Sequence, residues 1–191
     1  MVATVKTCRS LLRLLSFATL FEMGFAEGAE TALEPPPAYG LAARRMGVPA
    51  ELLFAVALQE SDVTLRGQRI PWPWTLNIAG GSRYFPRESD ACDTIQRALK
   101  HHPPSQIDAG LAQINLGHQR HFYRHPCELL RPHRNLEVAA TILRNHHRQG
   151  EDWLLAAGRY HRPAGGPLAT RYRDRIRKHL DQLASKRRLQ P

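Results

Sequence analysis

Residues 52–64, LLFAVALQESDVT, decide how the rest of this chain is interpreted. Every position from 52 to 58 is apolar, a pattern typical of a helix that is buried on all sides. Glu60 continues the apolar stripe of this helix, because it follows Leu53 by seven residues and Val56 by four. A carboxylate in that position costs free energy unless it is paired or protonated.

The position of Glu60 at the end of a buried helix predicts unusual acidity. Burial and the partial negative charge of a helix C-terminus both raise the pKa of a carboxyl group. A raised pKa suits a general acid that works near neutral pH. The alternative is a glutamate that turns outward to solvent at a fraying helix end, and this segment alone leaves both interpretations open.

Length and charge limit the class of protein. The chain has 191 residues, 42% of them hydrophobic and 7% aromatic, which is enough for one core of ordinary size. The net charge of +10 and the pI near 10.2 favour polyanionic surroundings such as cell-wall polymer, anionic lipid or nucleic acid. Charge alone does not choose among these partners.

The N-terminus has the pattern of an export signal. Three basic residues precede a short apolar stretch at 14–21, and small residues follow at 24–26, so we expect a signal peptide at 1–26 and a periplasmic protein. Glu22 interrupts the apolar stretch, which is far too short to span a bilayer. No other part of the sequence is long and apolar enough to do so. An amphipathic N-terminal helix of a cytoplasmic protein is the alternative.

The cysteines agree with export. Cleavage after Ala26 removes Cys8 and leaves Cys92 and Cys127, and an even pair in an oxidising compartment predicts one disulfide. It would close a loop of about 35 residues and stabilise the fold by ~3 kcal/mol. Two separate thiols are the alternative. The chain has no Cys-x-x-Cys spacing, which argues against redox catalysis and cysteine-based zinc sites.

Proline, glycine and helical periodicity divide the rest into short elements. We expect a linker at 27–37, a domain at 38–185 and a basic tail at 186–191. Six helices are predicted, at 38–46, 49–60, 89–100, 135–150 and 152–163 and around Tyr172 to Leu183. In the first of them, Tyr39, Leu41 and Ala42 are expected to face inward. Ser89, Asn135 and Asp152 are the expected N-caps. Alternation from Trp74 to Ile78, before Gly80-Gly81, predicts a hairpin. The fold class is therefore mostly α, a single domain with a small β-hairpin insertion.

Tyr160 ends the core-facing stripe of the 152–163 helix, much as Glu60 ends the stripe of its own helix. A phenol can donate a hydrogen bond to a carboxylate and hold it in place. An ordinary tyrosine at the core boundary is the alternative.

Four segments in order resemble the lytic transglycosylases of the soluble-lytic-transglycosylase (SLT) type. They are LLFAVALQES (52–61), DAGLAQIN (108–115), NLEVAATIL (135–143) and AAGRYH (156–161). The resemblance extends from about Ala38 to Tyr172 and implies a lysozyme-like fold of the goose-type class. PWPWTLNIAGG (71–81) further resembles the specialised members encoded with conjugative elements and type IV secretion or pilus systems.

The resemblance assigns roles to individual residues. Glu60 matches the single catalytic acid and base, and Tyr160 matches the tyrosine that hydrogen-bonds its carboxyl. The expected substrate-binding residues are Ser61, Asn77, Gly110, Gln113, Asn115 and Tyr160. Ala112 stands where the family usually has Met, which removes a flexible wall of the sugar groove. His161 replaces the usual Asn.

The resemblance also implies a reaction. Glu60 would protonate the glycosidic oxygen between N-acetylmuramic acid (MurNAc) and N-acetylglucosamine (GlcNAc) of a peptidoglycan strand, and the acetamido group would act as the nucleophile. Glu60 would then remove the proton of the 6-hydroxyl, which closes a 1,6-anhydro ring. This chemistry needs no metal or other cofactor. The partners implied are the glycan strand and components of a type IV secretion or pilus machine, without nucleic acid.

Other functions remain open. A hydrolytic muramidase would need a second carboxylate, for which Asp62, Asp93 and Asp108 are available. A helix over His118, His121 and His125 would place three possible metal ligands on one side, although no HExxH motif is present. The basic stretch 171–188 would suit nucleic acid or anionic wall polymer. A non-catalytic scaffold protein that kept the fold is a further alternative.

Overall fold

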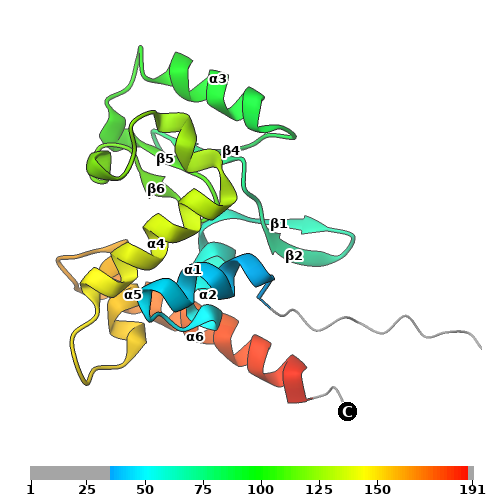
Figure 1. The fold of residues 1–191 in the computed structure, drawn as a ribbon, viewed down its shortest axis with the longest axis vertical. Helices are drawn as coiled ribbons and strands as arrows, with labels where there is room; N and C mark the ends of the chain where they lie inside the picture. The colour runs from blue at the N-terminus through cyan, green and yellow to red at the C-terminus, as the bar shows by residue number, and fades with distance from the viewer. Residues whose placement is uncertain (1–34, 189–191) are drawn as a thin grey trace, which may run out of the picture. The chain divides into compact units, whose positions relative to one another are not determined.

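The structure is a computed structural model that describes residues 35–188, with side chains described up to residue 185 (Figure 1). The expected signal peptide at 1–26, most of the linker at 27–37 and the end of the basic tail lie outside the described residues. Within the described part of the chain, no helix is both long enough and apolar enough to cross a membrane.

Helix α2 is the centre of the fold. All residues from Leu52 to Leu58 are at most 3% exposed, as expected for a helix buried on every side. Helices α1, α4 and α6 pack against it (Figure 1). The α-helices are α1 (Pro37–Met46), α2 (Ala50–Ser61), α3 (Glu88–Ala98), α4 (Pro132–His146), α5 (Trp153–His161) and α6 (Pro167–Arg188).

The strands form two small antiparallel sheets. One is a hairpin, β1 (Asp62–Leu65) and β2 (Gln68–Pro71), which follows α2 directly. The other has the order β4-β3-β5-β6 and is built from β3 (Thr75–Ile78), β4 (Gly81–Tyr84), β5 (Ile107–Ala109) and β6 (Ile114–Asn115). Within residues 35–188, three short 3-10 helices lie in the loops, η1 (Pro104–Gln106), η2 (Arg120–Phe122) and η3 (Pro126–Leu130).

The mostly α fold class with a small β insertion is confirmed, and so is the β3–β4 hairpin. The sequence did not predict β1, β2, β5 and β6, because strands of two to four residues carry too little alternation to be recognised. Leu41 is 43% exposed, so its predicted inward orientation is wrong.

Two of the three predicted N-caps are wrong. Asp152 does cap α5, since its carboxylate accepts a hydrogen bond from the Leu154 N–H. Ser89, however, lies inside α3, which begins at Glu88. Asn135 lies inside α4, which begins three residues earlier at Pro132, a residue suited to the first helical turn.

The predicted disulfide is confirmed. Cys92 of α3 is bonded to Cys127 of η3, across 35 residues of sequence. It ties a peripheral helix to the loop that leads into α4. The bond therefore fixes the part of the chain that carries β5 and β6.

Replacing both cysteines with serine is expected to lower the free energy of unfolding by about 3 kcal/mol, because the open chain gains loop entropy in the unfolded state. Urea denaturation with and without reductant measures this. The wild type should be destabilised by reductant, and the double variant should not respond. Equal stability of the oxidised wild type and the double variant would contradict the assignment.

Candidate active site

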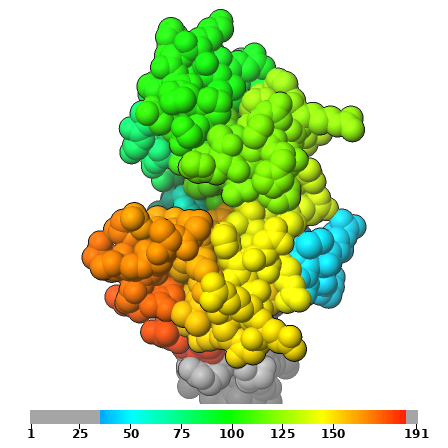
Figure 2. Space-filling model, turned by 90° about the vertical axis from the view of Figure 1, so that its left-hand side faces the viewer, coloured from blue at the N-terminus to red at the C-terminus, as the bar shows by residue number. Residues whose placement is uncertain are grey.

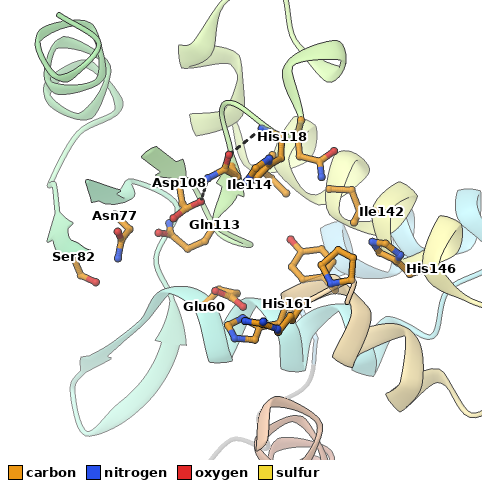
Figure 3. A pocket seen from close by; sticks show the side chains of 15 residues that line it. Glu60, Asn77, Ser82, Asp108, Gln113, Ile114, His118, Ile142, His146 and His161 are labelled. Carbon is orange, nitrogen blue, oxygen red and sulfur yellow. Dashed lines mark hydrogen bonds between the residues drawn. The ribbon is translucent and has the colours of Figure 1, made fainter. Parts of the chain in front are cut away.

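A pocket of about 530 Å³ lies between the four-stranded sheet and the ends of α4 and α5. Figure 2 shows it as a hollow between the green residues of the sheet region and the yellow and orange residues of these helices. Asn77, Asp108 and Gln113 line the wall on the sheet side, and Ile142 and His146 line the helical side (Figure 3). Glu60 projects into the pocket from the end of α2.

Glu60 is held by a tyrosine from the last helix. The Tyr172 hydroxyl donates a hydrogen bond of 2.7 Å to Glu60 Oε1. Packing of α6 against α2 brings the two residues together although 112 positions separate them. Tyr172 is 1% exposed, so its ring belongs to the core and its hydroxyl has a fixed direction. This contact orients the carboxyl at the pocket.

The surroundings of Glu60 raise its pKa from 4.5 to about 7. Desolvation by burial is the largest cause and favours the protonated form, and the nearby carboxylate of Asp108 acts in the same direction. The Tyr172 hydrogen bond and the Arg175 charge oppose them, because both stabilise the carboxylate. A carboxyl with this balance is available both as an acid and as a base near neutral pH.

Four polar side chains form a row across the sheet. Strand register pairs Ser82 with Asn77, Asn77 with Asp108, and Asp108 with Asn115. Register partners share one face of a sheet, and all four residues line the pocket. We name Ser82, Asn77, Asp108 and Asn115 the polar row.

Asp108 is the second carboxyl of the pocket. It accepts a hydrogen bond of 2.8 Å from Asn115 Nδ2. Burial raises its pKa, while the Asn115 hydrogen bond and the charge of His118 act in the opposite direction. Asn115 is in turn fixed by its Oδ1, which accepts hydrogen bonds from the Gly117 and His118 N–H groups.

The side-chain amide of a buried asparagine, Asn135, holds the turn at 110–115 in place. Asn135 accepts from the Ala112 N–H and donates to the carbonyls of Ala109 and Leu129. Gly110 has a φ of 81°, and a Cβ atom there would collide with the Asn135 amide, so only glycine fits. These hydrogen bonds fix the turn that presents Gln113 to the pocket.

Residues 38–182 match the sequence profile of the transglycosylase SLT domain. The chain belongs to this family. Members have a lysozyme-like fold and are lytic transglycosylases, which act on peptidoglycan, so family membership supports an enzyme of this kind. No curated protein and no solved structure gave a significant match to the chain.

The structure separates the residues that family resemblance selected into two groups. Asn77, Gln113, Asn115 and Tyr160 line the pocket with Glu60, and their roles in sugar binding stay predictions. Ser61 and Gly110 do not line it. Ser61 is 1% exposed, and its hydroxyl lies 2.7 Å from the Leu111 carbonyl, to which it donates. Both residues therefore support the 110–115 turn from within the protein, and their expected contact with substrate stays a prediction.

The hydrogen bond that the resemblance assigned to Tyr160 comes from Tyr172 instead. The Tyr160 hydroxyl donates its proton to the Ala112 carbonyl at 2.6 Å and so braces the 110–115 turn. Ala112 is fully buried and does not line the pocket, so it supplies no wall there, and the effect of the missing methionine on sugar contacts stays a prediction. Its methyl group belongs to the core beneath the turn.

His161, the second departure from the family pattern, lies beside Glu60 in the pocket (Figure 3). Its ring is stacked on Tyr172, with centroids 4.6 Å apart and planes inclined by 4°. Burial, together with the charges of Arg175 and Arg162, lowers its pKa, so the ring is neutral at neutral pH. His161 thus packs against the tyrosine that orients the acid.

The other candidates named from sequence lie elsewhere. Asp62 forms an ion pair with Arg69, and Asp93 is exposed on α3, so neither lines the pocket. The segment with His118, His121 and His125 contains a 3-10 turn in place of the helix considered. Within residues 35–188, no three possible metal ligands come together.

Sequence reasoning missed Tyr172, the hydrogen-bond partner of Glu60, and Asn135, which bonds the 110–115 turn. Tyr172 was assigned to the apolar stripe of the last helix, and Asn135 to a cap. A signal existed for Tyr172, because a buried phenol needs a hydrogen-bond partner. For Asn135 the sequence carried no sign that its amide would bond three backbone groups of distant segments.

Replacing Tyr172 with Phe is expected to move the alkaline limb of the kcat/KM profile to higher pH, because the hydrogen bond that stabilises the Glu60 carboxylate is lost. Loss of orientation should also lower kcat by roughly tenfold or more. Tyr160→Phe is the matched control, since it removes a hydroxyl bonded to Ala112, and its pH limb should stay in place. A shift in the control alone would assign the contact to Tyr160.

Glu60 is expected to make stability depend on pH. It ionises at about 4.5 when unfolded and at about 7 when folded, so the folded state loses stability as pH rises between these values. The full difference corresponds to about 3 kcal/mol. The free energy of unfolding of Glu60→Gln, measured by denaturation, should therefore rise relative to that of the wild type between about pH 4 and pH 8. A pH-independent difference would refute the raised pKa.

Proposed function

We propose that this protein cleaves the β-1,4 bond between MurNAc and GlcNAc of peptidoglycan without water, leaving 1,6-anhydroMurNAc ends. The observation that carries the proposal is Glu60, a carboxyl with a pKa near 7, oriented by Tyr172 at the edge of a pocket in an SLT-family fold. One group with this pKa can serve as acid in one step and as base in the next.

In the first step, protonated Glu60 gives its proton to the glycosidic oxygen, and the bond from this oxygen to C1 of MurNAc breaks. The carbonyl oxygen of the 2-acetamido group attacks C1, so the substrate supplies the nucleophile and no second carboxylate is required. The Tyr172 hydroxyl stabilises the carboxylate that Glu60 becomes. The GlcNAc-terminated part leaves with the transferred proton on its oxygen.

In the second step, the Glu60 carboxylate removes the proton of the MurNAc 6-hydroxyl. The 6-oxygen attacks C1 and displaces the acetamido oxygen, which closes the 1,6-anhydro ring and restores protonated Glu60. Atoms balance without water or any other reagent. The pKa near 7 keeps both protonation states of Glu60 accessible during the cycle.

The polar row and Gln113 supply the groups that a sugar chain needs. N-acetylated sugars present hydroxyl and amide groups, which amide and hydroxyl side chains recognise by hydrogen bonds. The Gln113 side-chain amide donates both of its protons to the Thr75 and Gly110 carbonyls. Its Oε1 is therefore the atom that can accept a hydrogen bond from the substrate. Asn77 and Asn115 are fixed by their own backbone contacts.

Hydrolysis is a second candidate because Asp108 lines the same pocket. A muramidase would use this carboxylate to activate water on the other face of the sugar. Burial raises the pKa of Asp108, which would favour a base, but the hydrogen bond from Asn115 acts in the opposite direction and holds the carboxylate as part of the pocket wall. The product, not the fold, distinguishes these two reactions.

We also propose that the protein is exported to the periplasm, with residues 1–26 as its signal peptide. The Cys92–Cys127 disulfide and a substrate that lies outside the cytoplasm support this. A small enzyme of this kind would make local openings in the wall for a secretion or conjugation apparatus. The segment 71–81, part of which forms β3 beside the pocket, is the sequence support for that role.

Digestion of purified peptidoglycan followed by mass analysis tests the reaction. The wild type should release fragments with anhydro ends, lighter by one water than hydrolysed fragments. Glu60→Gln keeps the shape but has no proton to give, and should lose activity by at least about a thousandfold. Asp108→Asn should keep anhydro products and move the alkaline limb to lower pH, because it removes a charge that raises the Glu60 pKa.

The same assay separates the remaining alternatives. Reducing ends that have gained water, and that vanish in Asp108→Asn, would establish a muramidase. No release of fragments by the wild type would favour a scaffold protein. Salt-dependent DNA retention without wall activity would favour a nucleic-acid-binding role for the basic face of α6.

A further inference from the structure

The helical side of the pocket carries a charge that the proposed reaction does not use. Among the described residues that line the pocket, Arg162 is the only one with a permanent positive charge. It follows α5 directly, as the C-cap residue, and its side chain is exposed. It forms no ion pair within the described part of the chain.

Arg162 does not serve the catalytic carboxyl. The positive group whose charge acts on Glu60 is Arg175, and the one that acts on Asp108 is His118. The charge of Arg162 acts on His161, its neighbour in the chain. Arg162 therefore lines the pocket without an ion pair to either carboxyl of the site.

The two sides of the pocket differ in chemistry. On the sheet side, the polar row and Gln113 offer amides, a hydroxyl and a carboxyl. On the helical side, Arg162 is joined by His146 and by the apolar Ile142 and Pro163 (Figure 3 labels Ile142 and His146). Burial and the charge of Arg159 lower the pKa of His146, so at neutral pH it is an uncharged hydrogen-bond donor.

An unpaired guanidinium in a pocket is suited to a carboxylate, which it binds through two parallel N–H···O bonds. The sugar rings of a glycan strand carry no charge. Carboxylates enter only through the substituent of the muramic sugar, either as the free lactyl group or within the stem peptide attached to it. The geometry points to Arg162 as the binding residue for a carboxylate of this muramic substituent, in a pocket that His146 also lines.

This inference rests on the proposed function, because it takes the glycan strand as the occupant of the pocket. It adds a determinant of specificity that the sugar contacts do not supply. A strand would be held by hydrogen bonds from its neutral groups on the sheet side and by a carboxylate–guanidinium contact on the helical side. The enzyme would thus distinguish strands by what their muramic residues carry.

Calorimetric titration tests the inference in the Glu60→Gln background, where ligands stay intact. Three soluble ligands are compared: peptidoglycan strands with stem peptides, strands freed of peptides so that lactyl carboxylates are exposed, and chito-oligosaccharides, which lack both. Arg162→Gln should weaken binding of the carboxylate-bearing ligand about tenfold, the effect of losing a charge-assisted hydrogen bond. Arg162→Lys should lose less. Arg124→Gln, an exposed arginine outside the pocket, is the control for net charge.

The ligands identify the source of the carboxylate. A loss confined to strands with peptides assigns it to the stem peptide, and a loss on peptide-free strands assigns it to the lactyl group. Equal affinities of Arg162→Gln and Arg124→Gln for all three ligands, or no binding by the parent protein, would overturn the inference. Calorimetric titration needs no cleavage, so the two proposals can fail separately. If the wild type does not cleave peptidoglycan but Arg162→Gln still weakens binding of the carboxylate-bearing ligand, only the proposed reaction is refuted.

Discussion

The contact between Glu60 and Tyr172 is the interaction on which the rest of the site depends. Burial of α2 pushes the Glu60 pKa upward, and the Tyr172 hydroxyl limits that rise to about 7. Neither effect alone gives a carboxyl that both donates and accepts a proton near neutral pH. Helix α6 therefore supplies the group that orients Glu60, although its outer face is a run of arginines.

A second set of contacts holds the wall opposite this acid. Asn135 and the Ser61 and Tyr160 hydroxyls all bond backbone groups between Ala109 and Ala112. Those bonds come from α2, α4 and α5, so three helices fix one short turn. This turn positions Gln113 at the pocket and, because it leads into β6, also positions the polar row. Several residues of the family motifs thus stabilise the backbone of the site.

Much of the fold and part of the site could be predicted from sequence. Periodicity located the buried helix and the position of Glu60 at its end, because both are local properties of ten residues. The partner of Glu60 was misassigned because Tyr160 and Tyr172 both lie on core-facing stripes, and only the packing of α6 on α2 decides between them. The sequence did not predict that the residues of the polar row lie side by side, because strand register joins residues as distant as Ser82 and Asn115.

Glu60 is expected to stay partly protonated near physiological pH, because burial raises its pKa to about 7. Carbon-13 NMR of the glutamate side-chain carboxyls, assigned by comparison with Glu60→Gln, measures its titration directly. The structure predicts a midpoint of about 7 for Glu60. A midpoint near the ordinary value of 4.5 would contradict the account, because Glu60 would then be ionised before it met its substrate.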